Sequence, residues 1–249
     1  MPGPAWLILP TYDEAANLAP LVAAVRGVFA EAAPDGHRIL VVDDASPDGT
    51  GAVADHLAAA HDDVEVLHRP GKLGLGGAYI AGFERALARG AGHVLQMDAD
   101  FSHDPQALRS LLAHAGEGAD LVLGSRYVEG GGVVGWHPLR RAVSRAGCRY
   151  ARTVLGVPVR DLTGGLKCFR AEALRAIGYA SVRSQGYTFQ VEMTYRALAA
   201  GLRVVEVPIV FSERREGRSK MTGAIALEAA WLVPALRSRS RRRLPTSEA

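Results

Sequence analysis

The chain has 249 residues, 48% of them hydrophobic, which is enough for one domain with a full core and excludes wholesale disorder. The net charge of +3 is small, and only three of the 29 basic residues are lysine; arginine suits forked contacts with phosphate oxygens. The two cysteines form neither a disulfide framework nor a CxxC pair, which indicates a reducing compartment and no structural zinc.

The beginning of the chain has no basic segment before its short apolar run, so we expect no signal peptide. No uncharged apolar stretch reaches the roughly 18 residues that a membrane span needs. We therefore expect no transmembrane helix.

Short apolar runs alternate with alanine-rich helical patterns in the first half of the chain. The runs predict strands at 6–10, 38–43, 64–68, 93–98 and 119–125, and the patterns predict helices near 14–32, 50–60, 76–89 and 105–114. This alternation is typical of an α/β fold, with a mostly parallel sheet flanked by helices. Ligands of such sheets bind beyond the carboxyl ends of the strands.

Polar motifs follow four of these five strands: PTYDE, DDASPDG, DADFSHD and SR. In the third motif, Asp98 and Asp100 lie one residue apart, and two such carboxylates repel unless a cation lies between them. A solvated turn is the simpler explanation of one such pair, but four motifs converging on one rim favour a site. The pair suits Mg²⁺ or Mn²⁺, which keep open positions for substrate phosphates.

The second motif has two interpretations. Asp43 and Asp44 can accept hydrogen bonds from a ribose or a base, whereas the segment 46–49, with Asp48, is typical of a turn and helix cap.

The later GKLGLGGA segment lacks the GxGxxG spacing and follows the third strand, so a dinucleotide-binding fingerprint is rejected. His103 lies near the carboxylate pair, but we expect it in the core or in a turn.

The pattern changes after residue 126. A glycine-rich loop leads to a predicted amphipathic helix at 139–155, then come a helical pattern at 187–200, a strand-like run at 203–211, a polar REGRSK loop and a last helix near 222–236. The helix at 139–155 is either an ordinary surface helix or one that lies on a membrane with arginines toward anionic headgroups. Its apolar stripe contains Leu139, Val143, Ala146, Tyr150 and Val154. The basic tail 237–249 is predicted to be disordered.

Nine segments of the sequence together resemble those of a known protein family: PTYDEAANL, LVVDDASPDGT, GLGGAYIAGF, MDADFSHDP, LVLGSRY, WxxxRRxxS, DLTGGLKCFR, YTFQVEM and ERREGRSK. In this order, over residues 5–222, they resemble the family 2 glycosyltransferases of the polyprenyl- or dolichyl-phosphate mannose synthase type. The resemblance implies a GT-A fold, a divalent metal, and inverting transfer of mannose from GDP-mannose to a polyprenyl phosphate. It also implies one catalytic domain at 1–236.

The resemblance assigns roles to residues position by position. It implies that the nucleotide sugar is bound by Pro10, Tyr12, Glu14, Val42, Asp44, Asp98, Ala99, Asp100, Arg214 and Lys220. It implies metal contacts from Asp98, Asp100 and Ser102, where some members have Gln at position 102, and acceptor-phosphate contacts from Arg126, Arg140 and Ser144. Asp100, Arg126 and Arg214 are the expected catalytic residues.

A phosphate acceptor is already anionic, so this chemistry needs cations and no general base. The alternative within the fold is a polyprenyl-phosphate glycosyltransferase that uses UDP-glucose or another nucleotide sugar; a glycan polymerase is disfavoured because no QxxRW motif occurs. A nucleic-acid-binding protein is disfavoured because acidic rim motifs repel phosphate backbones. Many relatives of this type carry C-terminal membrane helices, and we expect none in this chain. We therefore expect a cytoplasmic protein held peripherally on the inner, anionic face of the membrane, with a separate membrane-anchoring partner left open.

Overall fold

A seven-stranded mixed sheet forms the centre of the molecule. The computed structural model describes residues 3–33, 35–213 and 233–237. The strands lie in the order β3-β2-β1-β4-β7-β5-β8, and only β7 runs antiparallel to its neighbours. Their bounds are β1 Ala5–Thr11, β2 His37–Asp43, β3 Val64–His68, β4 His93–Gln96, β5 Leu121–Ser125, β7 Lys167–Arg170 and β8 Val204–Pro208. The α/β fold class is confirmed.

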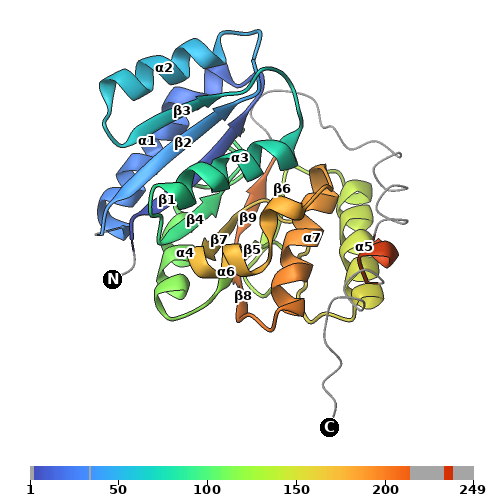
Figure 1. Cartoon of the computed structure of the whole chain (residues 1–249). Coiled ribbons are helices and arrows are strands. Elements are labelled where there is room, and N and C mark those ends of the chain that lie inside the picture. The colour runs from blue at the N-terminus through green and yellow to red at the C-terminus, as the bar shows by residue number, and fades with distance from the viewer. Residues whose placement is uncertain (1–2, 34, 214–232, 238–249) are drawn as a thin grey trace.

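Helices cover both faces of this sheet (Figure 1). They are α1 Ala15–Ala32, α2 Thr50–Ala60, α3 Leu75–Ala88, α4 Ala107–Gly116, α5 Pro138–Leu155, α6 Ala171–Ala176 and α7 Gly186–Ala199, with a 3₁₀ turn η1 Tyr179–Ser181. Side chains of a strand point alternately to the two faces. Trp6 and Ile8 accordingly pack with α3 and α7, whereas Leu7 and Leu9 pack with α1 and α4. The sheet is thus buried on both sides.

Helix α1 is long and apolar enough, by length and composition, to cross a membrane. Its apolar face is instead buried against the sheet, through residues that include Leu18, Leu21, Val25 and Phe29. This burial is what a core helix of a globular domain requires.

The run at 203–211, expected as one strand, forms two. Strand β8 pairs with β5 and ends at Pro208, and β9 (Val210–Ser212) pairs with β6 (Gly132–Val134) in a separate two-stranded sheet. Proline has no N–H to donate to a ladder, so a strand readily ends or changes partner there. This change brings Phe211 next to the end of the glycine-rich loop, where its ring lies 5.3 Å from that of Trp136.

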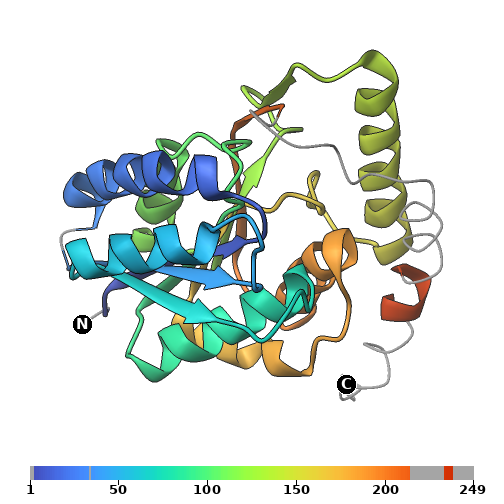
Figure 2. The same ribbon diagram turned by 90° about the horizontal axis from the view of Figure 1, so that it is seen from above.

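Helix α5 lies at the periphery, as Figure 2 shows from above. Only its C-terminal half enters the core, through Cys148, Ala151 and Leu155. Residues 233–237 are also helical, and two of them, Val233 and Leu236, are buried in the same cluster of apolar side chains. The remainder of the predicted helix at 222–236 and the basic tail after Arg237 lie outside the described residues.

Candidate functional site

A cavity of about 400 Å³ opens at the carboxyl ends of β1, β2, β4 and β5. Its walls come from all four strand-end motifs and from the first turns of α3 and α7. The predicted site residues that line it are Pro10, Tyr12, Glu14, Asp44, Asp98, Ala99, Asp100, Arg126 and Arg140. A volume of this size suits a small-molecule ligand.

The first motif forms the wall at the end of β1. Lys72 lies 3.7 Å above the centre of the Tyr12 ring, a cation–π contact that ties the loop before α3 to this wall. Glu14 accepts a hydrogen bond from Asn17 Nδ2 at 2.9 Å, and its backbone N–H donates to Thr50 Oγ1. These bonds hold the strand-to-helix turn in place.

Asp44 follows β2, and the protein itself already bonds to its carboxylate. Arg69 Nη1 donates to Oδ1 at 2.5 Å, and the backbone N–H groups of Leu73 and Gly74 donate to Oδ2 at 3.1 and 3.2 Å. Asp44 therefore fixes the loop before α3 against the cavity. The side chain of Val42, another predicted nucleotide contact, lies in the core beside Trp6 and Ile8.

The turn-and-cap interpretation of residues 46–49 is confirmed. Asp48 accepts hydrogen bonds from Thr50 N and Oγ1 and from Ala15 N, and so it joins the starts of α1 and α2. Burial raises the pKa of Asp48, but the hydrogen bonds from Thr50 and Ala15 outweigh it and leave that pKa below its usual value.

Each of the three acidic motifs contains a non-glycine residue with left-handed backbone geometry. These are Asp13 (φ 61°), Ala45 (φ 55°) and Phe101 (φ 57°). Such conformations cost about 1–3 kcal/mol each and concentrate at functional sites. The chain therefore tolerates strain where it turns its polar side chains toward the cavity.

Asp98 and Asp100 form the wall at the end of β4. Tyr79 is fully buried, its pKa is raised well above its usual value by burial and by the charge of Asp98, and its hydroxyl donates to Asp98 Oδ1 at 3.2 Å. Asp100 Oδ1 accepts from Ser102 N at 3.0 Å. Gly165 leaves room beside this pair, because a Cβ there would lie 3.2 Å from Asp98 Oδ2.

Two carboxylates on a cavity wall fit a divalent hard cation that also binds substrate oxygens. Among the residues that the structure describes, no group of three His, Cys, Asp or Glu side chains could enclose a metal by itself. Two carboxylates leave positions on such a cation open to water or to substrate oxygens. Ser102 is fully buried and is not among the described residues that line the cavity.

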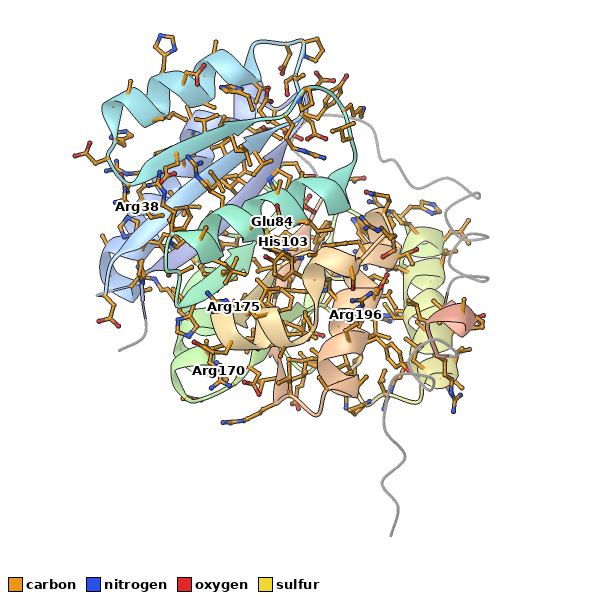
Figure 3. All side chains as sticks on the ribbon, in the orientation of Figure 1. Arg38, Glu84, His103, Arg170, Arg175 and Arg196 are labelled. Carbon is orange, nitrogen blue, oxygen red and sulfur yellow. The ribbon has the colours of Figure 1, made fainter. Side chains whose placement is uncertain are left out.

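His103 is buried in the body of the molecule, as expected (Figure 3). Its ring meets Phe211 edge-to-face, with centroids 5.0 Å apart, and burial lowers its pKa to about 4. It is therefore a neutral core residue behind the carboxylates.

Arg126, at the end of β5, is held by a partner that the sequence did not reveal. Its Nε and Nη2 donate to the two oxygens of Asp161 at 2.7 Å each, and Nη2 also donates to Thr163 Oγ1 at 2.8 Å. Burial disfavours the charged form of both groups, but the hydrogen bonds between them outweigh this effect. The pKa of Asp161 is therefore lowered and that of Arg126 is raised. Nη1 remains available to a ligand, since no described residue bonds to it.

Arg140 lies on the first turn of α5 and also lines the cavity. Its guanidinium stacks 4.1 Å above the Trp136 ring, and its Nη1 donates to Glu213 at 3.0 Å. Ser144, which we expected beside it, instead accepts a 2.7 Å hydrogen bond from Tyr127 and does not line the cavity. The structure thus brings two of the three predicted acceptor contacts together.

Several lining residues had no predicted role, among them Trp136, Thr163, Gln185 and Gln190. Three of them lie in the segments WxxxRRxxS, DLTGGLKCFR and YTFQVEM, whose order along the chain was the available signal. Arg214 and Lys220, predicted to bind the nucleotide sugar, lie outside the described residues.

The sequence family described as "Glycosyl transferase family 2" matches residues 6–178. A polyprenol monophosphomannose synthase from Mycolicibacterium smegmatis is 49% identical over 228 residues, which cover 91% of this chain and 84% of that protein. An undecaprenyl-phosphate mannosyltransferase from Micrococcus luteus is 51% identical over 222 residues, which cover 89% of each chain.

Solved structures share the fold at lower identity. Mannosyl-3-phosphoglycerate synthase from Rubrobacter xylanophilus has a TM-score of 0.67 at 22% identity, covering 98% of this chain and 77% of that one. Glucosyl-3-phosphoglycerate synthase from Mycobacterium tuberculosis, in complex with Mn²⁺, UDP-glucose and phosphoglyceric acid, has a TM-score of 0.66 at 19% identity, covering 98% and 81%. These two similarities concern the fold alone.

Proposed function

Since the chain belongs to glycosyl transferase family 2 and has the GT-A fold, we propose that it transfers mannose from GDP-mannose to a polyprenyl monophosphate. The products are polyprenyl-phosphate mannose and GDP, with inversion at the anomeric carbon. Two relatives of about this length, at 49% and 51% identity, are named for mannosyl transfer to such lipids. The observation that carries the proposal is the single cavity that holds both Asp98 and Asp100 and both Arg126 and Arg140.

The donor half of the cavity binds the nucleotide and its diphosphate. Pro10, Tyr12 and Glu14 form the nucleotide wall, and Asp44 orients the adjacent loop. Asp98 and Asp100 would hold Mg²⁺ or Mn²⁺, which supplies charge neutralisation to a departing diphosphate. Ser102 contributes to this site by donating its N–H to Asp100, and Ala99, between the two carboxylates, lines the same cavity.

The acceptor half aligns a phosphate that already carries negative charge. Arg126 offers Nη1 from a rigid, buried position, and Arg140 offers its guanidinium from the mouth of the cavity. No side chain has to remove a proton, so the work is positioning and charge stabilisation. Ser144 acts through Tyr127, which it holds beside Arg126.

The lipid reaches this half from a membrane surface. Leu139, Val143 and Tyr150 on α5 are 67%, 44% and 40% exposed, and Arg141, Arg145 and Arg149 on the same helix are exposed as well. Residues 1–236 act as one catalytic domain, and the basic tail 237–249 adds attraction to anionic lipid. The protein then works on the cytoplasmic face of the membrane without spanning it.

The test is turnover of radiolabelled GDP-mannose, GDP-glucose and UDP-glucose with a polyprenyl phosphate in the presence of Mn²⁺ or Mg²⁺. We expect label in the lipid fraction only when GDP-mannose is the donor. By NMR, the mannose in the product should have the anomeric configuration opposite to that in GDP-mannose. Label from UDP-glucose would select the alternative donor. Asp100→Ala should abolish turnover while the protein stays folded, and full activity of this variant or in chelator would contradict the metal site.

A further inference from the structure

Gln190, on the second turn of α7, carries a donor group that the protein leaves without a partner. Its side chain is 3% exposed and lines the cavity, yet its Nε2 has no hydrogen-bond partner among the described residues. A buried donor without a partner costs about 1–3 kcal/mol. Such a group in a cavity wall is a candidate ligand contact.

The hydrogen bonds around Gln190 determine which end of its amide is unpartnered. Gln96 Nε2 donates to the backbone oxygen of Gly165 at 3.0 Å, and a carbonyl oxygen only accepts. The same Nε2 lies 2.6 Å from Gln190 Oε1, which therefore has to be the accepting end. The remaining group, Nε2, is a pair of N–H donors.

The backbone beneath this side chain is held as well. The carbonyl oxygen of Gln190 accepts from Lys167 Nζ at 2.7 Å and from Thr194 Oγ1 at 3.1 Å, and Lys167 is fully buried. With its Oε1 bonded to Gln96 and its backbone held in this way, Gln190 has little freedom to turn toward another partner. A pre-positioned donor loses little entropy when a ligand binds to it.

The position of Gln190 along the sheet edge indicates which part of the substrate it meets. The nucleotide wall lies at β1 and β2, the carboxylates follow β4, and Arg126 follows β5. Gln190 bonds to Gln96 on β4 and lies beside Gly165, which leads into β7 between β4 and β5. It therefore lies between the carboxylates and the acceptor arginine, where the sugar in transit has to be.

We propose that Gln190 is a sugar-positioning residue whose Nε2 donates a hydrogen bond to a hydroxyl oxygen of the transferred hexose. A neutral amide suits a neutral hydroxyl, whereas the charged groups on either side suit the diphosphate and the acceptor phosphate. The inference rests on the proposed function for the identity of the sugar donor.

Calorimetric titration of GDP and of GDP-mannose, with Mn²⁺ and without acceptor, tests the proposal. Gln190→Met keeps the length of the side chain and removes the donor. We expect it to weaken GDP-mannose binding roughly five- to twenty-fold and GDP binding less than two-fold. Equal weakening of both ligands, or of neither, would overturn the proposal.

Gln185→Met is the matched control. Gln185 lines the same cavity, but its Oε1 accepts from Gly76 N at 3.1 Å on the nucleotide side. We expect this variant to change the binding of GDP and GDP-mannose by the same factor.

A measurement on the unaltered protein covers the case in which Gln190→Met does not fold. Among monodeoxy analogues of GDP-mannose, one should lose affinity by a similar factor, and Gln190→Met, where folded, should be insensitive to that deletion. If no analogue loses affinity, the proposal is wrong. If the unaltered protein uses another nucleotide sugar, the titrations are done with that nucleotide sugar and its nucleoside diphosphate in place of GDP-mannose and GDP. A wrong donor assignment is thereby distinguished from a wrong role for Gln190.

Discussion

Asp161→Asn tests whether Arg126 depends on its buried partner. Asp161 is fully buried and Arg126 is 5% exposed, and the two share a bidentate contact with both N···O distances at 2.7 Å. The substitution keeps the shape but removes the charge and turns an N–H₂ group toward the guanidinium. Removing one partner of a buried ion pair costs about 3–5 kcal/mol, because the other charge is left uncompensated.

We therefore expect Asp161→Asn to lower the free energy of unfolding by about 3–5 kcal/mol in urea titrations, and Tm by roughly 6–20 °C. The matched control is Asp55→Asn, which breaks an exposed pair with His68 at 2.9 Å and should cost less than about 1 kcal/mol. The double variant Arg126→Met/Asp161→Leu should be more stable than Asp161→Asn, since no uncompensated guanidinium remains at this position. A loss below about 1 kcal/mol for Asp161→Asn would refute this account.

Three further predictions concern the acceptor site, pH and the membrane. Arg140→Ala should raise KM for polyprenyl phosphate or lower kcat with GDP-mannose binding nearly unchanged; collapse of donor binding alone would contradict the acceptor assignment. Burial lowers the pKa of Lys167 from 10.5 to about 7, with Asp161 opposing it. Between these values the unfolded chain binds the proton that the folded chain has lost, so stability relative to Lys167→Met should rise by up to a few kcal/mol from pH 7 to pH 10. A flat difference in urea titrations would show that Lys167 is not desolvated as described. Sedimentation with anionic vesicles should be strong at low salt, weak at high salt, and reduced by Leu139→Ser/Val143→Ser. Failure to sediment at low salt would exclude peripheral binding.

The first half of the fold could be predicted because local pattern and local structure agree there. The strand expected at 64–68 has these bounds in the structure, the one expected at 38–43 begins one residue earlier at His37, and four strand-end motifs do line one cavity. Strand β7 was not predicted, because its four residues begin and end with a basic side chain, Lys167 and Arg170, and have no strand pattern of their own. It is a strand because β4 and β5 lie on either side of it.

The same limit applied to the site. Asp161 is 35 positions from Arg126, and nothing in its local sequence distinguishes it from a loop residue. The role of Gln190 depends on which atoms Gln96 and Gly165 present to it, which no spacing reveals. Ordered motifs identified the segments, but the partners within them depend on tertiary packing.

The insertion of β7 between β4 and β5 also affects how the molecule can be assembled. During synthesis, β1 to β5 emerge as one run of strands and helices, but β4 and β5 have no strand between them until residues 167–170 arrive. Until then both strands present open edges, which are sites for mispairing and aggregation. A fragment that ends before residue 167 should therefore tend to aggregate when it is produced alone. A complementation pair split within the glycine-rich loop at 129–132 should regain activity only when the second piece supplies the missing strand.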